Sequence, residues 1–285
     1  MSCPDCFRGE TWVGQPSGSE STIHGLRTYI AKPADGAVPR GLIIFITDAL
    51  GMEFVNNKLL CDAYAKKGQF LVYCPDFMDG HAVDTKIIQL MNSMKTDPAV
   101  AAEAGAMMTK WRANTTMEIT HPRVVSFLQQ IRCSPPPFAT DDLKVGVAGF
   151  CWGGKHAFLL AHDAPSSRIV RHGDASKQPQ ALVDCAWTAH PSMLEIPADA
   201  KAVQLPLSVV VGGEDVNFTA DKQKQVKEIL EKDKAGAGHE VIIMTEKGAS
   251  HGFAVRMDPD DADMVLRAQE AEELALKWFG KWLVA

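Results

Sequence analysis

The chain has 285 residues, of which 46% are hydrophobic and 22% are charged, so it is long enough to bury a substantial core in a single domain. Its net charge of −6 provides no global attraction for nucleic acid or for an anionic membrane, and we expect neither as a partner. No apolar run approaches the length of a membrane span, and the first residues lack a basic and then apolar signal segment, so a cytoplasmic protein is expected.

The first part of the chain alternates between strand and helix patterns. Residues 26–31 are expected to form an early strand, and the continuous apolar run 42–48 is typical of a central parallel strand buried on both faces. A helix is expected over 54–67, with Gly68 as its C-cap, before another strand over 70–76. Strands that alternate with helices in this way predict right-handed crossovers and a parallel sheet.

The segment 84–130 contains no convincing strand and is predicted to be a mostly helical insertion. Methionine adapts to irregular shapes, so its concentration here could mark the lining of a substrate pocket or a cap over it. Helical spacing favours the other interpretation, in which these side chains are core faces of packed helices. The residues concerned are Met91, Met94, Met107, Met108, Trp111 and Met117.

A strand predicted over 145–150 ends in the sequence Gly149-Phe150-Cys151-Trp152-Gly153-Gly154, which a helix pattern follows. This Gly-x-Cys-x-Gly pattern is typical of a nucleophile elbow that carries a thiol, because so sharp a turn needs very small flanking residues. The N-terminus of the following helix would favour a thiolate and, during reaction, an oxyanion. Taken alone, Cys151 would also fit an ordinary small buried residue.

The rest of the chain continues the alternating pattern. Apolar strands are expected over 181–189, 206–211 and 241–244, and amphipathic helices over 220–234 and 261–283. No internal repeat or linker interrupts the chain, so we expect one domain over its whole length, residues 1–285.

Two of these strands lead into groups that an elbow hydrolase needs, in the chain order nucleophile, acid, base. We expect Cys151 to be the nucleophile and His251 the base, with Asp215 holding the imidazole and the adjacent Glu214 as the alternative acid. His190 could compete with His251 for the role of base, and Asp215 could instead only cap the helix that follows it.

An oxyanion hole is expected from two backbone N–H groups. One belongs to Trp152, directly after the nucleophile. The second normally comes from the loop after an early strand, here Asp48-Ala49-Leu50-Gly51, and we expect Ala49 to supply it.

Seven cysteines without the spacing of a disulfide scaffold fit a reducing compartment. Cys3 and Cys6 have the spacing of half a zinc site or a redox pair, but the chain offers no second pair of ligands. We therefore expect neither a metal nor a cofactor. Four other cysteines lie in apolar or helical surroundings and are expected to be structural: Cys61, Cys74, Cys133 and Cys185.

The elbow, the acidic turn and the histidine loop together resemble the dienelactone hydrolase family, the carboxymethylenebutenolidases of the α/β-hydrolase fold. The similarity extends from about Gly41 to the C-terminus, and the segments 74–76 and 189–192 resemble fungal members in particular. This resemblance implies a mostly parallel central sheet flanked by helices, with the helical insertion around residues 84–130.

The resemblance also implies roles for two charged residues. The family places an acid immediately before the oxyanion loop, where it accepts the thiol proton, and here that position is Asp48. Family members bind the substrate carboxylate with two arginines, and Arg256 resembles one of them, whereas no arginine occurs at 77–80, where the other is expected. By spacing, a salt bridge from Arg256 to an acid within 258–263 is an equal alternative.

We therefore expect a cofactor-free hydrolase of a small-molecule lactone, ester or thioester, acting as a monomer or homodimer through an acyl-enzyme on Cys151. The missing arginine favours an alternative, a general carboxylesterase or thioesterase for neutral acyl substrates. A non-catalytic small-molecule binder on the hydrolase scaffold is the contrasting class, and the complete set of three expected catalytic residues argues against it.

Overall fold

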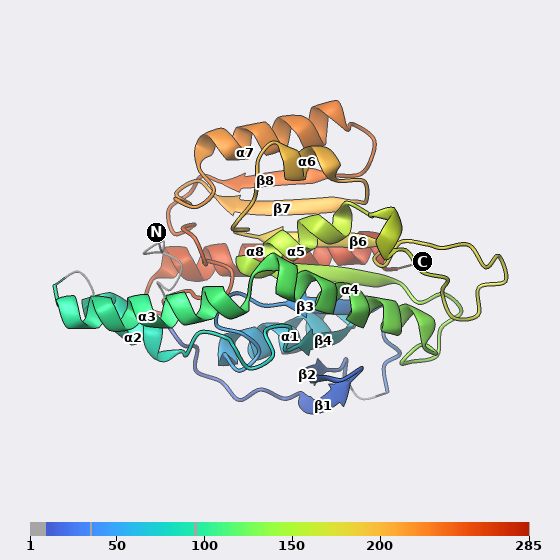
Figure 1. The fold of residues 1–285 in the computed structure, drawn as a ribbon, viewed down its shortest axis with the longest axis horizontal. Helices are drawn as coiled ribbons and strands as arrows, with labels where there is room; N and C mark the ends of the chain where they lie inside the picture. The colour runs from blue at the N-terminus through green and yellow to red at the C-terminus, as the bar shows by residue number, and fades with distance from the viewer. Residues whose placement is uncertain (1–9, 35, 94–95, 285) are drawn as a thin grey trace.

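The computed structural model describes residues 10–34, 36–93 and 96–284, and within them one sheet of eight strands forms the centre of the molecule. All neighbouring strands pair in parallel except at one edge, where β1–β2 and β2–β4 are antiparallel. The order across the sheet is β1-β2-β4-β3-β5-β6-β7-β8 (Figure 1). The strands are β1 (Ser19–Ile23), β2 (Leu26–Ala31), β3 (Leu42–Ile46), β4 (Leu71–Pro75), β5 (Val145–Phe150), β6 (Cys185–Ala189), β7 (Leu207–Gly212) and β8 (Glu240–Met244).

The strand order reverses next to β3. The chain passes from β3 to its neighbour β4, and later returns to place β5 on the other side of β3. In open α/β sheets such a reversal leaves a crevice outside the carboxyl ends of the two strands, because the connections lead away from it on opposite faces. Loops after β3 and β5 therefore meet at the position where a ligand site is expected.

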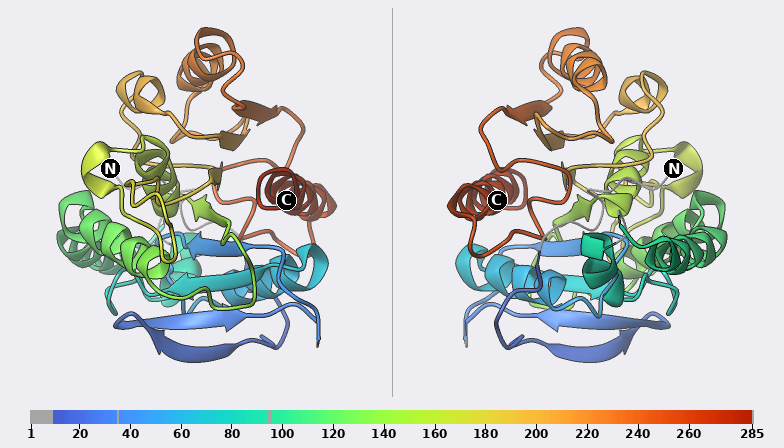
Figure 2. Two further views of the ribbon diagram at one scale, coloured as in Figure 1. Left: turned by 90° about the vertical axis from the view of Figure 1, so that its right-hand side faces the viewer. Right: turned by 90° about the vertical axis from the view of Figure 1, so that its left-hand side faces the viewer.

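Helices cover both faces of this sheet. Figure 2 shows α1 and α8 on one face and α4 and α5 on the other. The central strands are buried along their whole length, as the continuous apolar runs predict. The helices are α1 (Val55–Gly68), α2 (Lys86–Ser93), α3 (Pro98–Asn114), α4 (Met117–Cys133), α5 (Trp152–Ala161), α6 (Ala198–Ala202), α7 (Ala220–Lys227) and α8 (Ala262–Trp282), and a π-helical turn, Glu228–Asp233, continues α7.

Two apolar cores result, one on each face. The core under α4 and α5 contains Phe127, Trp152 and Phe158, whereas the core under α1 and α8 contains Tyr64 and Trp278. Burial of such side chains on both faces of one sheet is the main driving force for folding.

Most expected elements are present, and the differences have local causes. The insertion is helical, as α2, α3 and α4. The strand β1 was not expected, because its polar sequence Ser19–Ile23 lacks alternation, yet it pairs with β2 through a turn in which His24 and Gly25 both have positive φ. Helix α1 includes Gly68, and Gln69 is the residue that adopts the left-handed conformation, so the expected C-cap at Gly68 was wrong by one position.

The sulfur-containing residues divide between core and surface. Cys61, Cys74 and Cys185 are buried in apolar surroundings, but Cys133 is exposed at the end of α4, against expectation. Met108 belongs to the core, while Met107 and Trp111 also line a surface cavity of about 380 Å³. The helical insertion therefore contributes side chains both to the core and to the lining of this surface cavity.

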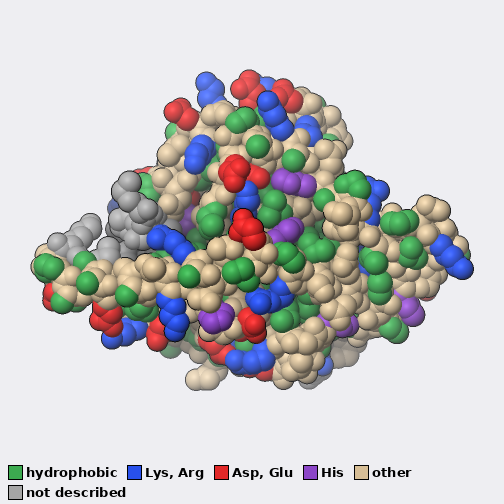
Figure 3. All heavy atoms as spheres, viewed as in Figure 1, with side chains coloured by type: hydrophobic (Ala, Val, Ile, Leu, Met, Phe, Trp, Pro, Cys, Tyr) green, Lys and Arg blue, Asp and Glu red, His purple; other side chains and the backbone are tan. Residues whose placement is uncertain are grey.

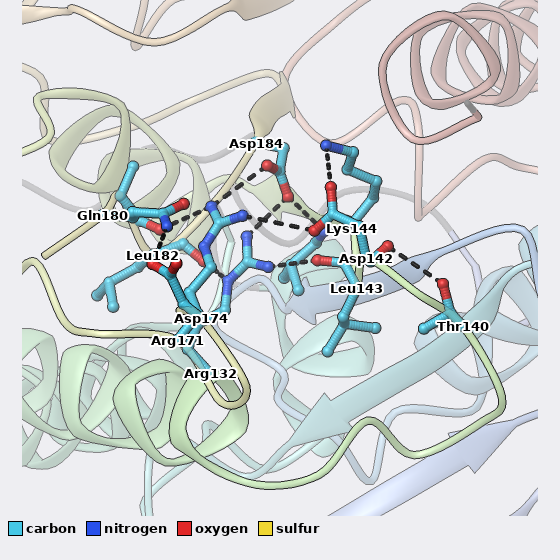
Figure 4. Close-up of polar contacts among 12 residues, drawn as sticks. Arg132, Thr140, Asp142, Leu143, Lys144, Arg171, Asp174, Gln180, Leu182 and Asp184 are labelled. Carbon is cyan, nitrogen blue, oxygen red and sulfur yellow. Dashed lines mark hydrogen bonds and ion pairs between the residues drawn. The ribbon is translucent and has the colours of Figure 1, made fainter. Parts of the chain in front are cut away.

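A network of charges around the buried Arg132 lies at the amino ends of β5 and β6 (Figure 4). Arg132 on α4 donates to the carbonyl oxygen of Leu182 at 2.7 Å and to a carboxylate oxygen of Asp184 at 2.7 Å. Arg171 approaches the other oxygen of Asp184 at 3.3 Å. On the face of the molecule in Figure 3, by contrast, basic and acidic side chains are interspersed.

Candidate active site

Cys151 lies at the sharp turn between β5 and α5. Its φ of 50° and ψ of −109° are unusual for a residue other than glycine. The turn is possible because Gly153 packs directly on the backbone of Ile46 and Thr47, where a Cβ would collide. The structure therefore has the elbow geometry that the glycine pattern predicts, with Cys151 at the N-terminus of a helix.

His251 and Asp215 form a buried pair beside this turn. The Nδ1 atom of His251 is 2.8 Å from a carboxylate oxygen of Asp215, and neither side chain is exposed to solvent. The other carboxylate oxygen of Asp215 accepts the N–H groups of Asn217 at 2.8 Å and of Phe218 at 3.1 Å. These bonds hold the carboxylate in the orientation that its contact with the imidazole requires.

The electrostatic surroundings favour a protonated imidazole. Burial lowers the pKa of His251, but the charge of the Cys151 thiolate, the hydrogen bonds with Asp215 and Cys151 and the charge of Asp215 outweigh it, raising the pKa to about 10. An opposite charge close to a buried group stabilises the ionised form of both partners. The buried imidazole of His251 therefore favours its protonated form.

The alternative acid and base occupy different environments. Glu214 is exposed, so the structure brings Asp215 rather than Glu214 to His251. His190 is fully buried, and its ring lies edge-on to that of His251, with the centroids 5.2 Å apart. Burial and the nearby charges of His251 and Arg256 lower the pKa of His190 well below its usual range. It therefore packs beside the site as a neutral ring.

The two expected oxyanion donors lie at the carboxyl ends of neighbouring strands. Trp152 is the first residue of α5, where an N–H has no intrahelical acceptor. The carbonyl oxygen of Ala49 accepts the N–H of Val83 at 2.8 Å, which fixes the loop after β3. Within the described part of the chain, neither the N–H of Ala49 nor that of Trp152 donates to the protein.

Asp48 and Arg256 form a fully buried ion pair at the start of the loop after β3. Burial raises the pKa of Asp48, Arg256 opposes that change, and the Cys151 thiolate adds to it, so Asp48 lies within electrostatic reach of the sulfur. Arg256 is thus paired with Asp48, which is distant in the sequence. This partner differs from the nearby acids at 258–263, which were the alternative.

Two residues near the site had no expected role. Asn57 on α1 is fully buried and donates to Asp48 at 3.2 Å and to the carbonyl oxygen of Gly51 at 2.9 Å. The sequence signal that could have indicated Asn57 is an asparagine on an apolar helix face.

The hydroxyl of Ser192 lies 3.5 Å from the sulfur of Cys151. In the sequence, only the position of Ser192 after the end of a strand indicated such a contact.

A cavity borders the oxyanion loop. It has a volume of about 370 Å³, and its lining includes Leu50, Met52, Ala82 and Val83. Since Val83 also hydrogen-bonds the carbonyl oxygen of Ala49, the wall of this cavity is attached to the loop itself. Met193 and Val216, which follow Ser192 and Asp215, are exposed apolar side chains near the same edge of the sheet.

Other expected features lie apart from this site. Cys3 and Cys6 fall outside the described residues. Among the residues that are described, no three His, Cys, Asp or Glu side chains are grouped so that they could hold a metal ion. Likewise, none of the described helices is both long and apolar enough to cross a membrane.

Comparisons with known proteins agree with this architecture. The model of the dienelactone hydrolase family matches residues 26–283. Hydrolase tropI of Talaromyces stipitatus is 28% identical to the chain over 99% of the chain and 96% of its own length. Dienlactone hydrolase 1 of Gibberella moniliformis is 23% identical, over 98% of the chain and 93% of its own length.

A solved structure is also similar. The crystal structure of dienelactone hydrolase from Anabaena variabilis superposes with a TM-score of 0.59, covering 94% of this chain and 98% of that one. Their sequences are 16% identical, so this likeness establishes the fold alone.

Proposed function

Because this chain belongs to the dienelactone hydrolase family, with the α/β-hydrolase fold and the carboxylic ester hydrolase class that its motifs predict, we propose that it acts through an acyl-enzyme on Cys151. The observation that carries the proposal is the buried contact between His251 and Asp215, together with the influence of the Cys151 thiolate on the same imidazole. A thiolate, a base and an orienting carboxylate are the groups that nucleophilic acyl transfer requires.

The first half of the proposed reaction forms the acyl-enzyme. The Cys151 thiolate attacks the substrate carbonyl carbon, and the carbonyl oxygen becomes an oxyanion that the N–H groups of Ala49 and Trp152 stabilise. When the tetrahedral intermediate collapses, the carbon–oxygen bond to the leaving group breaks. The proton of the His251 imidazolium passes to the departing oxygen, which in a lactone remains attached to the acyl chain.

The second half regenerates the enzyme. Neutral His251 takes a proton from a water molecule, whose oxygen attacks the thioester carbon. Collapse of this second intermediate expels the thiolate and releases the acid, so Cys151 and His251 return to their starting charges. We propose Asp48 as a further acceptor for the thiol proton when Cys151 is neutral, since a charge on the sulfur raises the pKa of the Asp48 carboxyl group.

The decisive test is acylation of Cys151. With p-nitrophenyl acetate, the wild-type enzyme should release a burst of p-nitrophenol and acquire one acetyl group on Cys151, detected by peptide mass spectrometry. Cys151→Ala should show neither, and Cys151→Ser should retain weak turnover at best, because the site does not readily ionise an alcohol. Cys133→Ala, which removes an exposed cysteine, is the matched control and should behave like the wild type. Retained turnover in Cys151→Ala would overturn the proposal.

One observation favours a second candidate, a carboxylesterase or thioesterase for neutral acyl substrates. Arg256 is fully buried and already paired with Asp48, and the segment after β4 has no arginine. A substrate carboxylate that enters a partly dry pocket needs such a charge-assisted partner. The two candidates are separated by comparing a carboxylate-bearing lactone with its methyl ester. If the KM is lower for the acid than for the methyl ester, and Arg256→Ala abolishes this difference, the first candidate, a lactone hydrolase, is supported. A preference for the methyl ester supports the second candidate, an esterase or thioesterase for neutral substrates.

A further inference from the structure

Ser192 lies closer to the reacting sulfur than its place in the sequence predicts. Its Oγ is 3.5 Å from the Sγ of Cys151, within the range of a hydrogen bond to sulfur. The residue as a whole is half-buried. Because a thiolate only accepts hydrogen bonds, the hydroxyl is the donor whenever Cys151 is ionised.

The position of this hydroxyl is determined by the surrounding backbone. Register places Phe150 opposite Ala189, so the segments after β5 and β6 leave the sheet side by side. The N–H of Ser192 donates to the carbonyl oxygen of Cys151 at 3.0 Å, and that of His190 donates to β7 at 2.8 Å.

Backbone conformation and packing fix the same loop. Positive φ values of 38° at His190 and 60° at Met193 turn the chain back toward the elbow on either side of Ser192. Gly154 allows Pro191 to pack against α5, since a Cβ there would lie 2.7 Å from the Cβ of Pro191. Several independent constraints therefore fix where Ser192 lies.

We propose that Ser192 is a further catalytic residue, which donates a hydrogen bond to the Cys151 thiolate and stabilises it before attack. This inference rests on the proposed function of Cys151 as the nucleophile. Hydrogen bonds to charged groups are stronger than those between neutral groups, so the hydroxyl favours the ionised sulfur over the neutral thiol. Once the sulfur is acylated it is a poor acceptor, and the hydroxyl is released toward the acyl group.

The test measures ionisation of the thiol without turnover. The rate of Cys151 alkylation by iodoacetamide, followed by mass spectrometry across a pH series, rises with the thiolate fraction. In Ser192→Ala the midpoint of this profile should move up by about one pH unit. At pH values below the midpoint, this shift is equivalent to a tenfold smaller thiolate fraction. Ester turnover should fall about tenfold at pH values below the wild-type midpoint and recover at higher pH.

Two further variants separate this role from a structural one. Ser192→Thr keeps the hydroxyl and should restore the wild-type midpoint. Ser208→Ala removes a buried hydroxyl from β7 that contacts Glu240, and it should leave the midpoint unchanged. The N–H of Ser192 remains in every variant, so the backbone bond to Cys151 is retained.

Three results would overturn the inference: an unchanged midpoint in Ser192→Ala, an equal shift in Ser192→Thr, or a loss of turnover that is the same at every pH. Failure of the proposed function is distinguishable, because it would appear as turnover that does not depend on Cys151, while the alkylation midpoint would still report on Ser192.

Discussion

His251 lies between a carboxylate and a sulfur, and both determine its protonation. Burial alone would leave the imidazole neutral, since desolvation disfavours its charged form. The opposing contributions of Cys151 and Asp215 reverse that preference. The hydrogen bond from Nδ1 to Asp215 also selects the tautomer, which leaves Nε2 for the sulfur and the substrate.

At this scale we predict that Asp215→Asn reduces kcat by roughly three to four orders of magnitude while leaving the fold intact, because an amide offers the imidazole the wrong hydrogen-bonding partner. Glu214→Gln is the matched control and should differ little from the wild type, since Glu214 is exposed. Steady-state kinetics, with circular dichroism to check folding, measure both. A larger loss in Glu214→Gln would make Glu214 the acid.

Helix α5 connects Cys151 to a second buried cluster. The hydroxyl of Thr120 donates to the carbonyl oxygen of Thr116 at 2.8 Å, so it accepts from Nε2 of His156, 3.3 Å away. The Nδ1 of His156 is then an acceptor, and the Nδ1 of His121, at 3.1 Å, must carry the proton. The ring of His156 in turn packs against that of Trp152, with centroids 4.4 Å apart. These hydrogen bonds thus require that His156 be neutral, and a charged His121 would be buried beside it.

This pair predicts loss of stability in acid. Burial, assisted by the charges of His162 and Lys155, lowers the pKa of His121 from 6.5 to about 4. The unfolded chain therefore binds more protons than the native protein between these values, and stability falls as pH decreases from 6.5 toward 4. The full shift corresponds to about 3 kcal/mol.

Urea unfolding at pH 7 and pH 4.5 measures this effect. The loss of free energy of unfolding between the two pH values should be smaller in His121→Phe, which keeps the ring stacked on His156 but cannot titrate. His172→Phe, at an exposed histidine, should retain the wild-type loss. An unchanged loss in His121→Phe would contradict the assignment to this pair.

Across the whole molecule, Arg132 connects segments that are far apart in the sequence. Its guanidinium joins the end of α4 to residues 143, 182 and 184 (Figure 4). These residues lie at the amino ends of β5 and β6, whereas Cys151 follows the carboxyl end of β5. Burial acts to raise the pKa of Asp184, but Arg132 and Arg171 lower it overall, so the carboxylate remains charged inside the protein. Removal of Arg132 would leave Asp184 with the more distant Arg171 alone, and it would deprive the carbonyl oxygens of Leu143 and Leu182 of their donor.

We therefore predict that Arg132→Met lowers the free energy of unfolding by about 3–5 kcal/mol, while the activity of each folded molecule stays close to that of the wild type. Denaturant unfolding combined with active-site titration measures the two quantities separately. Arg27→Met removes an exposed arginine that pairs with Glu20 and Glu53, and it should cost about 1 kcal/mol or less. Equal effects of the two substitutions would show that burial of the network is unimportant.

Features that depend on neighbouring residues could be predicted from the amino-acid sequence. The glycines around Cys151 predict the sharp turn, because only very small residues fit there, and the continuous apolar runs predict strands buried on both faces. The family and the α/β-hydrolase fold followed from these local motifs, and both were confirmed.

Contacts between groups that are distant in the sequence could not be predicted in this way, because they depend on how the separate elements pack. The sequence favoured Asp215 with the adjacent Glu214 as the alternative acid, and the fold buries Asp215 against His251 while it exposes Glu214. Arg256 lies 208 positions from Asp48 in the chain, so no local pattern could pair them. The contact of Ser192 with Cys151 likewise depends on the pairing of β5 with β6. Such contacts arise from the packing of separate elements, because burial and charge compensation act through space rather than along the chain.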